Sequence, residues 1–284
     1  MLATVLLALA ASACWGTSDF TSGFKARSVP LPIVLMMSQG IGLAMAAILV
    51  LAGGRGLPGA GPALASLGAG VCAVVGLGCF YRALATGTMS IVAPIAATGV
   101  VIPVLAGVLG GNHLTALQVI GMFGAVAGVV LAARQSDAQA ARLDRRAHRE
   151  AVALALVAAV AFGGYFVLAH IGVRGGVAWM LLLAHVTSVV GVIVLAVLAG
   201  VRRPRLALRG DLGVLALAGV LDFAATGLYG LANRHGQLAI VAVAGSLYPV
   251  ATVLLARAIL SERVVRLQAL GVGLALAGVA LIAA

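Results

Sequence analysis

Apolar residues in this chain occur in long runs, separated by short breaks that hold most of the charged residues. A helix needs about 20 mostly apolar residues to cross the hydrocarbon core of a membrane. Strands of a membrane barrel would alternate polar and apolar residues, which these runs do not do. We therefore predict an all-α integral membrane protein with ten transmembrane helices, at about residues 3–23, 31–52, 64–85, 89–110, 115–133, 151–172, 177–199, 212–233, 237–258 and 265–284.

The longest polar segment, residues 134–150, divides the chain into two halves of five predicted helices, 1–133 and 151–284. The halves are alike in sequence. Residues 117–133 and 267–283 lie 150 positions apart and are identical at nine of 17 positions. The matches that carry most weight are Gln118/Gln268, Gly121/Gly271, Gly128/Gly278, Gly78/Gly227 and, more loosely, Trp15-Gly16/Phe162-Gly163. The chain is therefore a duplication.

The odd number of helices in each half has a mechanical consequence. A repeat that crosses the membrane five times leaves its successor to start on the opposite side, so we predict that the two halves are inverted relative to each other. Inverted repeats are common in secondary transporters, where substrate binds near the midplane between them and rocking opens each side in turn. Within the fifth predicted helix, Gly124 and Gly128 form a pair of the type that lets helix backbones approach closely.

The distribution of Lys and Arg predicts the orientation. Fifteen of the 18 lie in or beside the breaks after the first, third, fifth, seventh and ninth helices, and five of these are the arginines of 134–150. Cytoplasmic loops carry such an excess of positive charge. We therefore expect the 134–150 loop in the cytoplasm and both termini outside, in a cell membrane, most simply a bacterial inner membrane.

Composition excludes several other classes of protein. Hydrophobic residues make up 63% of the 284 residues and charged ones only 9%, with a mean hydropathy of +1.20, whereas soluble domains have about 25% charged residues. The net charge of +11 is spread over the breaks rather than over one face, so we expect no nucleic-acid partner. The first apolar run lacks the basic start of a signal peptide and is interpreted as the first transmembrane helix.

Two acidic residues within the apolar runs are candidates for substrate binding or ion coupling. Asp222 lies near the middle of the eighth predicted helix, where a carboxylate costs about 2.5 kcal/mol or more unless it meets a cavity or a partner. It can exchange a proton with substrate, or serve as a structural hydrogen-bonding group. Asp19, near the end of the first helix, lines the cytoplasmic end of a pathway or pairs with Lys25 or Arg27.

Prolines interrupt two helices that correspond across the duplication. Pro94 and Pro103 lie in the fourth and Pro249 in the ninth, and each removes one backbone hydrogen bond. Freed carbonyls at membrane depth are tolerated where protein or cavity water satisfies them. We predict either a cavity between these two helices, with hydroxyls offered by Ser90, Thr98, Ser246 and Tyr248, or an ordinary packing kink in each.

Aromatic residues and one histidine complete the candidate site. Trp15, Tyr81, Tyr165 and Tyr229 can form an aromatic wall for an organic substrate or mark the membrane interface, as we expect of Trp179. His185, in the seventh helix, either titrates in the physiological pH range or packs as a core residue with its hydrogen bonds satisfied. Cys14, Cys72 and Cys79 lack the spacing of a redox or zinc pair. The sequence contains no metal, cofactor or nucleophile motif, and we predict neither a cofactor nor enzymatic activity.

At the level of whole motifs the chain resembles the drug/metabolite transporter superfamily, in its EamA-like branch. The resemblance is carried by WGTSDF at 15–20 and by YPVATVLLARAILSERVVRLQALGVGLALAGVAL at 248–281, with one EamA-like unit in each half. The first half departs from the pattern, because Gly111-Asn112-His113 stands where Gly-Glu-Arg is usual, so only Glu262 of the second half can perform whatever that glutamate does. Glu262 otherwise caps the tenth helix or pairs with Arg266.

The resemblance implies transport of small metabolites. We expect a secondary transporter that moves a small organic compound, such as an amino acid, an amine or a drug-like molecule, by alternating access with proton-coupled export through Asp222. The alternatives are a facilitator or exchanger that uses no proton gradient, an intramembrane enzyme or lipid-handling protein, and a structural assembly factor. The expected partners are the substrate and the lipid bilayer, and the sequence leaves monomer and homodimer open.

Overall fold

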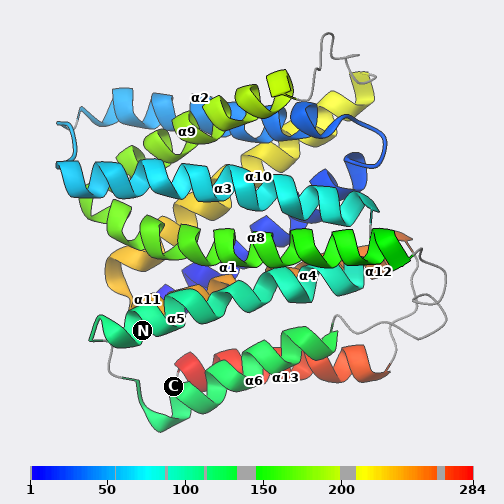
Figure 1. Cartoon of the computed structure of the whole chain (residues 1–284). Helices are drawn as coiled ribbons and strands as arrows, with labels where there is room; N and C mark the ends of the chain where they lie inside the picture. Colours follow the sequence, from blue (N-terminus) through cyan, green and yellow to red (C-terminus); the bar gives the residue numbers. More distant parts are fainter. Residues whose placement is uncertain are drawn as a thin grey trace.

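A computed structural model describes residues 2–54, 56–86, 89–111, 114–132, 145–198, 209–260 and 266–283. The regular secondary structure of these ranges is entirely helical, and the helices run side by side along one common direction (Figure 1). In chain order they are α1 Leu2–Lys25, α2 Leu31–Gly53, α3 Ala60–Thr86, α4 Met89–Ala97, η1 Thr98–Val100, α5 Val101–Leu109, α6 Ala116–Ala132, α8 Arg145–Gly172, η2 Val173–Gly175, α9 Val177–Leu198, α10 Arg209–His235, α11 Leu238–Gly245, α12 Tyr248–Leu260 and α13 Arg266–Ala283.

Six of the predicted spans are present as helices long and apolar enough to cross a membrane: α1, α2, α3, α8, α9 and α10. They coincide with the predicted spans at 3–23, 31–52, 64–85, 151–172, 177–199 and 212–233. Shorter apolar helices occupy the fourth, fifth and ninth predicted spans, and α13 occupies the tenth. The prediction of an all-α membrane protein is therefore confirmed.

The fourth and ninth predicted spans are divided rather than continuous. The fourth consists of α4 and α5 joined by the tighter 3-10 turn η1, and the ninth breaks at Ser246 and Leu247, between α11 and α12. Pro249 lies in the first turn of α12, where a missing backbone N–H leaves no hydrogen bond unmade. It therefore helps to begin a new helix instead of kinking an intact one. Pro103 lies in the first turn of α5, which follows η1 without a gap.

Each break packs against a glycine of the other half. A side chain at Gly16 of α1 would collide with the Tyr248 carbonyl oxygen and with Ala251, and one at Gly163 of α8 would collide with the Gly99 carbonyl oxygen and with Ile102. The recurrence of Trp15-Gly16 as Phe162-Gly163 thus has a physical reason. Only a residue without a side chain allows the first helix of one half to touch the broken helix of the other.

The two halves interlock. The first helix of each half lies along the third helix of the other, α1 on α10 and α8 on α3, and the last helices, α6 and α13, pack on each other along one side of the bundle (Figure 1). Both chain ends lie at the same end of the bundle. The space between the halves is therefore walled by helices from both.

Candidate functional site

The described part of the chain encloses a cavity in the middle of the bundle. The space between its walls, mouth included, is about 600 Å³, of which about 60 Å³ is open to the centre of a water molecule. Since one water needs roughly 10–15 Å³ of such space, the cavity has room for about four waters. It is lined by Trp15, Asp19, Gln39, Ala73, Leu77, Phe162, Tyr165, Phe166, Ala184, His185, Ser188, Asp222, Thr226 and Tyr248.

Asp222 of α10 is held by side chains of α2. Its Oδ2 atom accepts hydrogen bonds from Gln39 Nε2 at 3.0 Å and from Ser38 Oγ at 3.3 Å, and all three residues are buried. Thr226, one turn further along α10, donates to the Asp222 backbone carbonyl at 2.9 Å. The carboxyl group therefore faces a cavity and has fixed donors, two conditions that make an acid tolerable at this depth.

Asp19 of α1 lines the same cavity. Its Oδ1 atom accepts a hydrogen bond from the Tyr81 hydroxyl of α3 at 2.9 Å, and both side chains are buried. The alternative expectation, an ion pair between Asp19 and Lys25, is wrong: Lys25 pairs instead with Asp211 at the start of α10. The reason is position, because Asp19 points into the bundle while Lys25 ends α1 near its rim.

His185 brings a third titratable group to the cavity, from α9. Its Nδ1 is 2.7 Å from the Leu181 carbonyl oxygen, so Nδ1 carries the donated proton. The imidazole edge with Nε2 lies against Gly42 of α2, where a side chain would collide with it. The ring also approaches Phe223, with 5.8 Å between centroids.

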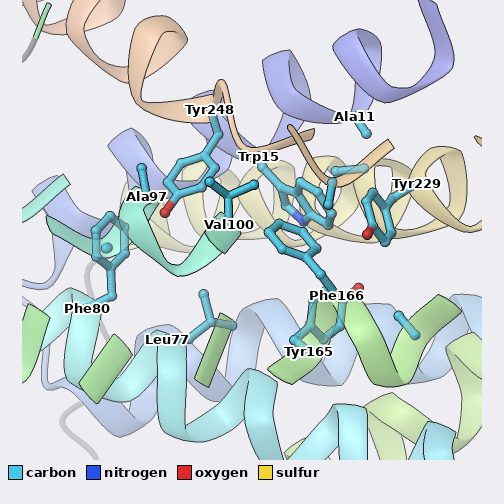
Figure 2. Close-up of a cluster of buried hydrophobic side chains, with 14 of the residues drawn as sticks. Ala11, Trp15, Leu77, Phe80, Ala97, Val100, Tyr165, Phe166, Tyr229 and Tyr248 are labelled. Carbon is cyan, nitrogen blue, oxygen red and sulfur yellow. The ribbon is translucent and has the colours of Figure 1, made fainter. Parts of the chain in front are cut away.

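Aromatic rings gather in one cluster around Trp15 (Figure 2), and several of them, such as Trp15, Tyr165 and Phe166, line the cavity together with the two acids. Trp15 makes ring contacts with Tyr165, Phe166 and Tyr229 at centroid distances of 6.2, 5.9 and 5.4 Å. Tyr248 makes edge-on contacts with Phe80 and Phe162. The hydroxyls of Tyr165, Tyr229 and Tyr248 are buried and find no hydrogen-bond partner among the described residues. Of these three tyrosines, Tyr165 and Tyr248 line the cavity and can bind a guest.

Several predicted site residues do not reach this cavity. Tyr81 and Tyr229 are completely buried behind its wall. Thr98 is exposed and bonds back to the Ile95 carbonyl, and Ser246 bonds back to that of Val243. Pro249 is buried in the first turn of α12, and the side chains of Ser90 and Pro94 lie outside the described ones. The cavity is therefore not formed between the two divided helices, which contribute only Tyr248 to its described lining.

The sequence analysis missed the uncharged polar residues. Ser38, Gln39 and Thr226 surround Asp222, and Ser188 lines the cavity from α9. The signal that could have revealed them was Gln39, a glutamine at membrane depth in the second predicted span. Burying its amide group without a hydrogen-bond partner costs free energy. Trp179, near the start of α9, lines a groove between α2, α9 and α10 instead.

The cavity lining follows the duplication. The spacing of 147 residues that relates Trp15 to Phe162 also relates Asp19 to Phe166, and the spacing of 149 that relates Gly78 to Gly227 also relates Leu77 to Thr226 and Ala73 to Asp222. All eight of the lining residues in these pairs come from equivalent places in the two halves. The walls thus come from paired positions, while the carboxyl groups do not: the position equivalent to each acid in the other half holds an apolar residue.

Comparisons with known proteins agree with this architecture. The model of the EamA-like transporter family matches residues 2–134 and 149–284, one match in each half. A solved structure described only as "Crystal structure of protein" has a TM-score of 0.76 to this chain at 18% identity, covering 98% of this chain and 96% of that one, which shows a shared fold. No curated protein matches the chain. Because the family model covers nearly all of both halves, the chain belongs to the EamA-like transporter family.

Proposed function

We propose that this protein is a secondary transporter that moves a small organic molecule across the cell membrane by alternating access through the central cavity. The observation that carries the proposal is the position of the cavity, between two interlocked halves whose equivalent residues line it in pairs. All ten predicted helices, with the divided ones counted once each, then cross the membrane as two inverted sets of five.

The small size of the cavity supports a mechanism in which its walls move when substrate binds. Space for about four waters is too small for a drug-sized or amino-acid-sized guest, since small-molecule sites usually enclose about 300–1,000 Å³. The divided helices are suited to such movement because their breaks rest on Gly16 and Gly163, which let backbone contact backbone without interlocking side chains. Substrate binding would widen the cavity, and rocking of the halves about these contacts would expose it to one side and then the other.

Asp222 is the residue we assign to proton coupling. It is the acid deepest in the apolar sequence, it lines the cavity, and its two donors hold it in place in either protonation state. A carboxyl group so placed can hold a proton while the cavity faces one side and release it on the other.

Reconstitution tests both parts of the proposal. The protein in liposomes that contain a pH-sensitive dye is exposed to a panel of amino acids, amines, drug-like compounds and sugar nucleotides. We expect substrate-driven proton movement in the wild type, its loss in Asp222→Asn, and no change in Glu150→Gln. Glu150 is the matched control because it is exposed and only weakly paired with Arg82, at 3.8 Å.

The outcomes separate the candidate functions. Substrate flux that ignores pH and survives in Asp222→Asn would identify a facilitator or an exchanger that uses no proton, and would reduce Asp222 to a structural group. An absence of flux for every compound of the panel would contradict transport and favour a lipid-handling or enzymatic role.

A further inference from the structure

We infer that the substrate is an organic cation with an apolar or aromatic body, and that its binding displaces one proton from each of Asp19 and Asp222. The inference rests on the proposed transport function and names its substrate class. Two observations carry it: the charge of the groups in the cavity, and the unpartnered hydroxyls in its aromatic wall.

The charge of the lining selects for a positive guest. Two carboxyl groups face the cavity, and His185 is the only basic side chain among its described lining residues. Described arginines and lysines, such as Lys25, Arg82, Arg174 and Arg234, lie near helix ends. An anion would enter this cavity with no fixed positive partner, and a buried unpaired charge is strongly unfavourable. A cation meets two groups that can each become its counter-charge.

The acids retain capacity for a ligand. An ionised carboxylate offers about four acceptor sites, and the hydrogen bonds described above give two donors to Asp222 and one to Asp19. With the indole N–H of Trp15, which also bears on Asp222, at most four donors thus serve two groups that accept roughly eight hydrogen bonds together. The remaining capacity can be met by a proton, by water or by an ammonium group, and these compete for the same atoms.

The aromatic wall suits the body of such a cation. Trp15 lies one helical turn before Asp19 on α1, so both project to the same face. A cation over the face of a tryptophan is attracted by the negative charge that the ring carries on its face. Phe162, Phe166 and Leu77 offer apolar surface, and the hydroxyls of Tyr165 and Tyr248, which are more than nine-tenths buried and unpartnered, can bond to polar groups of the guest.

The two acids do not titrate alone. Asp222 is faced by Asp19 from α1 and by His185 from α9, with Tyr165 from α8 and the neutral Ser38 and Gln39 from α2. Asp19 is faced by Tyr81 from α3 and by Tyr248 from α12. The protons of such a set belong to the group as a whole. The number of protons released is therefore a better measure than the pH midpoint of any one residue.

Binding in detergent solution tests the inference without requiring transport. Tetraphenylphosphonium serves as the cation, and tetraphenylborate is an anion of the same shape. Calorimetric titration in two buffers of different ionisation enthalpy gives the number of protons released for each ion bound. We expect tetraphenylphosphonium to release about two protons from the wild type and from Glu150→Gln, and about one from Asp19→Asn or Asp222→Asn, with at least tenfold weaker binding in the double variant.

Conservative variants guard against loss of folding. Asp19→Glu and Asp222→Glu should restore the second proton, while size-exclusion chromatography confirms that each asparagine variant remains monodisperse. Equal binding of the borate, or proton release that is the same in Asp19→Asn as in the wild type, would overturn the inference. No binding of the cation, together with flux of an anionic or neutral compound in liposomes, would overturn it while leaving the transporter intact. Binding with proton release but no flux of any compound would contradict transport alone.

Discussion

His185 occupies space that the absence of a side chain at Gly42 makes available. The imidazole fits between α2 and α9 with its Nε2 edge against the Gly42 backbone, while Nδ1 is fixed to the Leu181 carbonyl. Gly42 lies one turn after Ser38 and Gln39, so one face of α2 positions both Asp222 and His185. At the scale of single residues, α2 thus positions two of the three titratable groups of the cavity, Asp222 and His185.

Gly42→Ala tests this arrangement. The new methyl group would overlap the His185 ring, and we expect unfolding in detergent to show a loss of about 1–3 kcal/mol, typical of an overpacked site. The same substitution in a His185→Ala background should be nearly neutral, because the colliding ring is gone. A cost that is equal in both backgrounds would mean that the two residues do not interact.

The site residues that could be predicted from the sequence are those whose polar or charged groups cost free energy to bury in lipid. Asp19, Asp222, His185, Trp15, Tyr165 and Tyr248 all line the cavity. Ser38, Gln39 and Phe166 were missed, and Thr98 and Tyr229 were placed in it wrongly. A helix that is apolar on every side gives no periodic signal of which face is inside, so its rotation is set by neighbours and cannot be read from the helix alone.

Among the helices, α6 and α13 approach each other closely through two glycines. A side chain at Gly128 would collide with the Ala275 nitrogen and the Gly271 carbonyl, and one at Gly278 with the Ala125 nitrogen and the Gly121 carbonyl. These two glycines are equivalent in the duplication. A side chain at Gly124, the other small residue noted in the sequence, would make only ordinary contact, at 3.6 Å, with Gly278 Cα.

Gly128→Ala should therefore separate α6 from α13. We expect a loss of about 1–3 kcal/mol in unfolding free energy, since backbone atoms cannot move aside as a side chain can. Gly273→Ala is the matched control: nothing lies within 4 Å of the added methyl, and alanine in a helix interior gains about 0.5–1 kcal/mol over glycine. Equal effects of the two substitutions would contradict this account of the contact.

At the scale of elements, the positions of the apolar helices were predicted correctly, but their continuity was not. Hydrophobic length predicted where apolar helices occur, because membrane thickness sets that length. It did not predict the breaks at η1 and at Ser246-Leu247, because proline position within a run is compatible with a kink or with a new start. The glycine against which each break packs lies in the other half of the chain, so the sequence around the break does not reveal it.

For the whole molecule, the charge bias makes a directional prediction. Lys25, Arg82 and the start of α8 lie at one end of the bundle, and both termini lie at the other. In a variant with Cys14, Cys72 and Cys79 replaced by serine, Gly56→Cys should react with an impermeant maleimide in intact cells, and Ser136→Cys only after permeabilisation. The reverse pattern would place both termini in the cytoplasm.

The unequal carboxyl groups have a consequence for the resting protein. In a duplicated transporter with identical halves, the inward-facing and outward-facing states would be degenerate, because they would have the same free energy. In the proposed mechanism, Asp19 at the position equivalent to Phe166 and Asp222 at the position equivalent to Ala73 remove that degeneracy, because the two conformations would hydrate the acids differently. Without substrate, the protein should therefore populate one of these two states more than the other. Which state it favours is set by these few side chains, because the rest of the fold is arranged with two-fold symmetry.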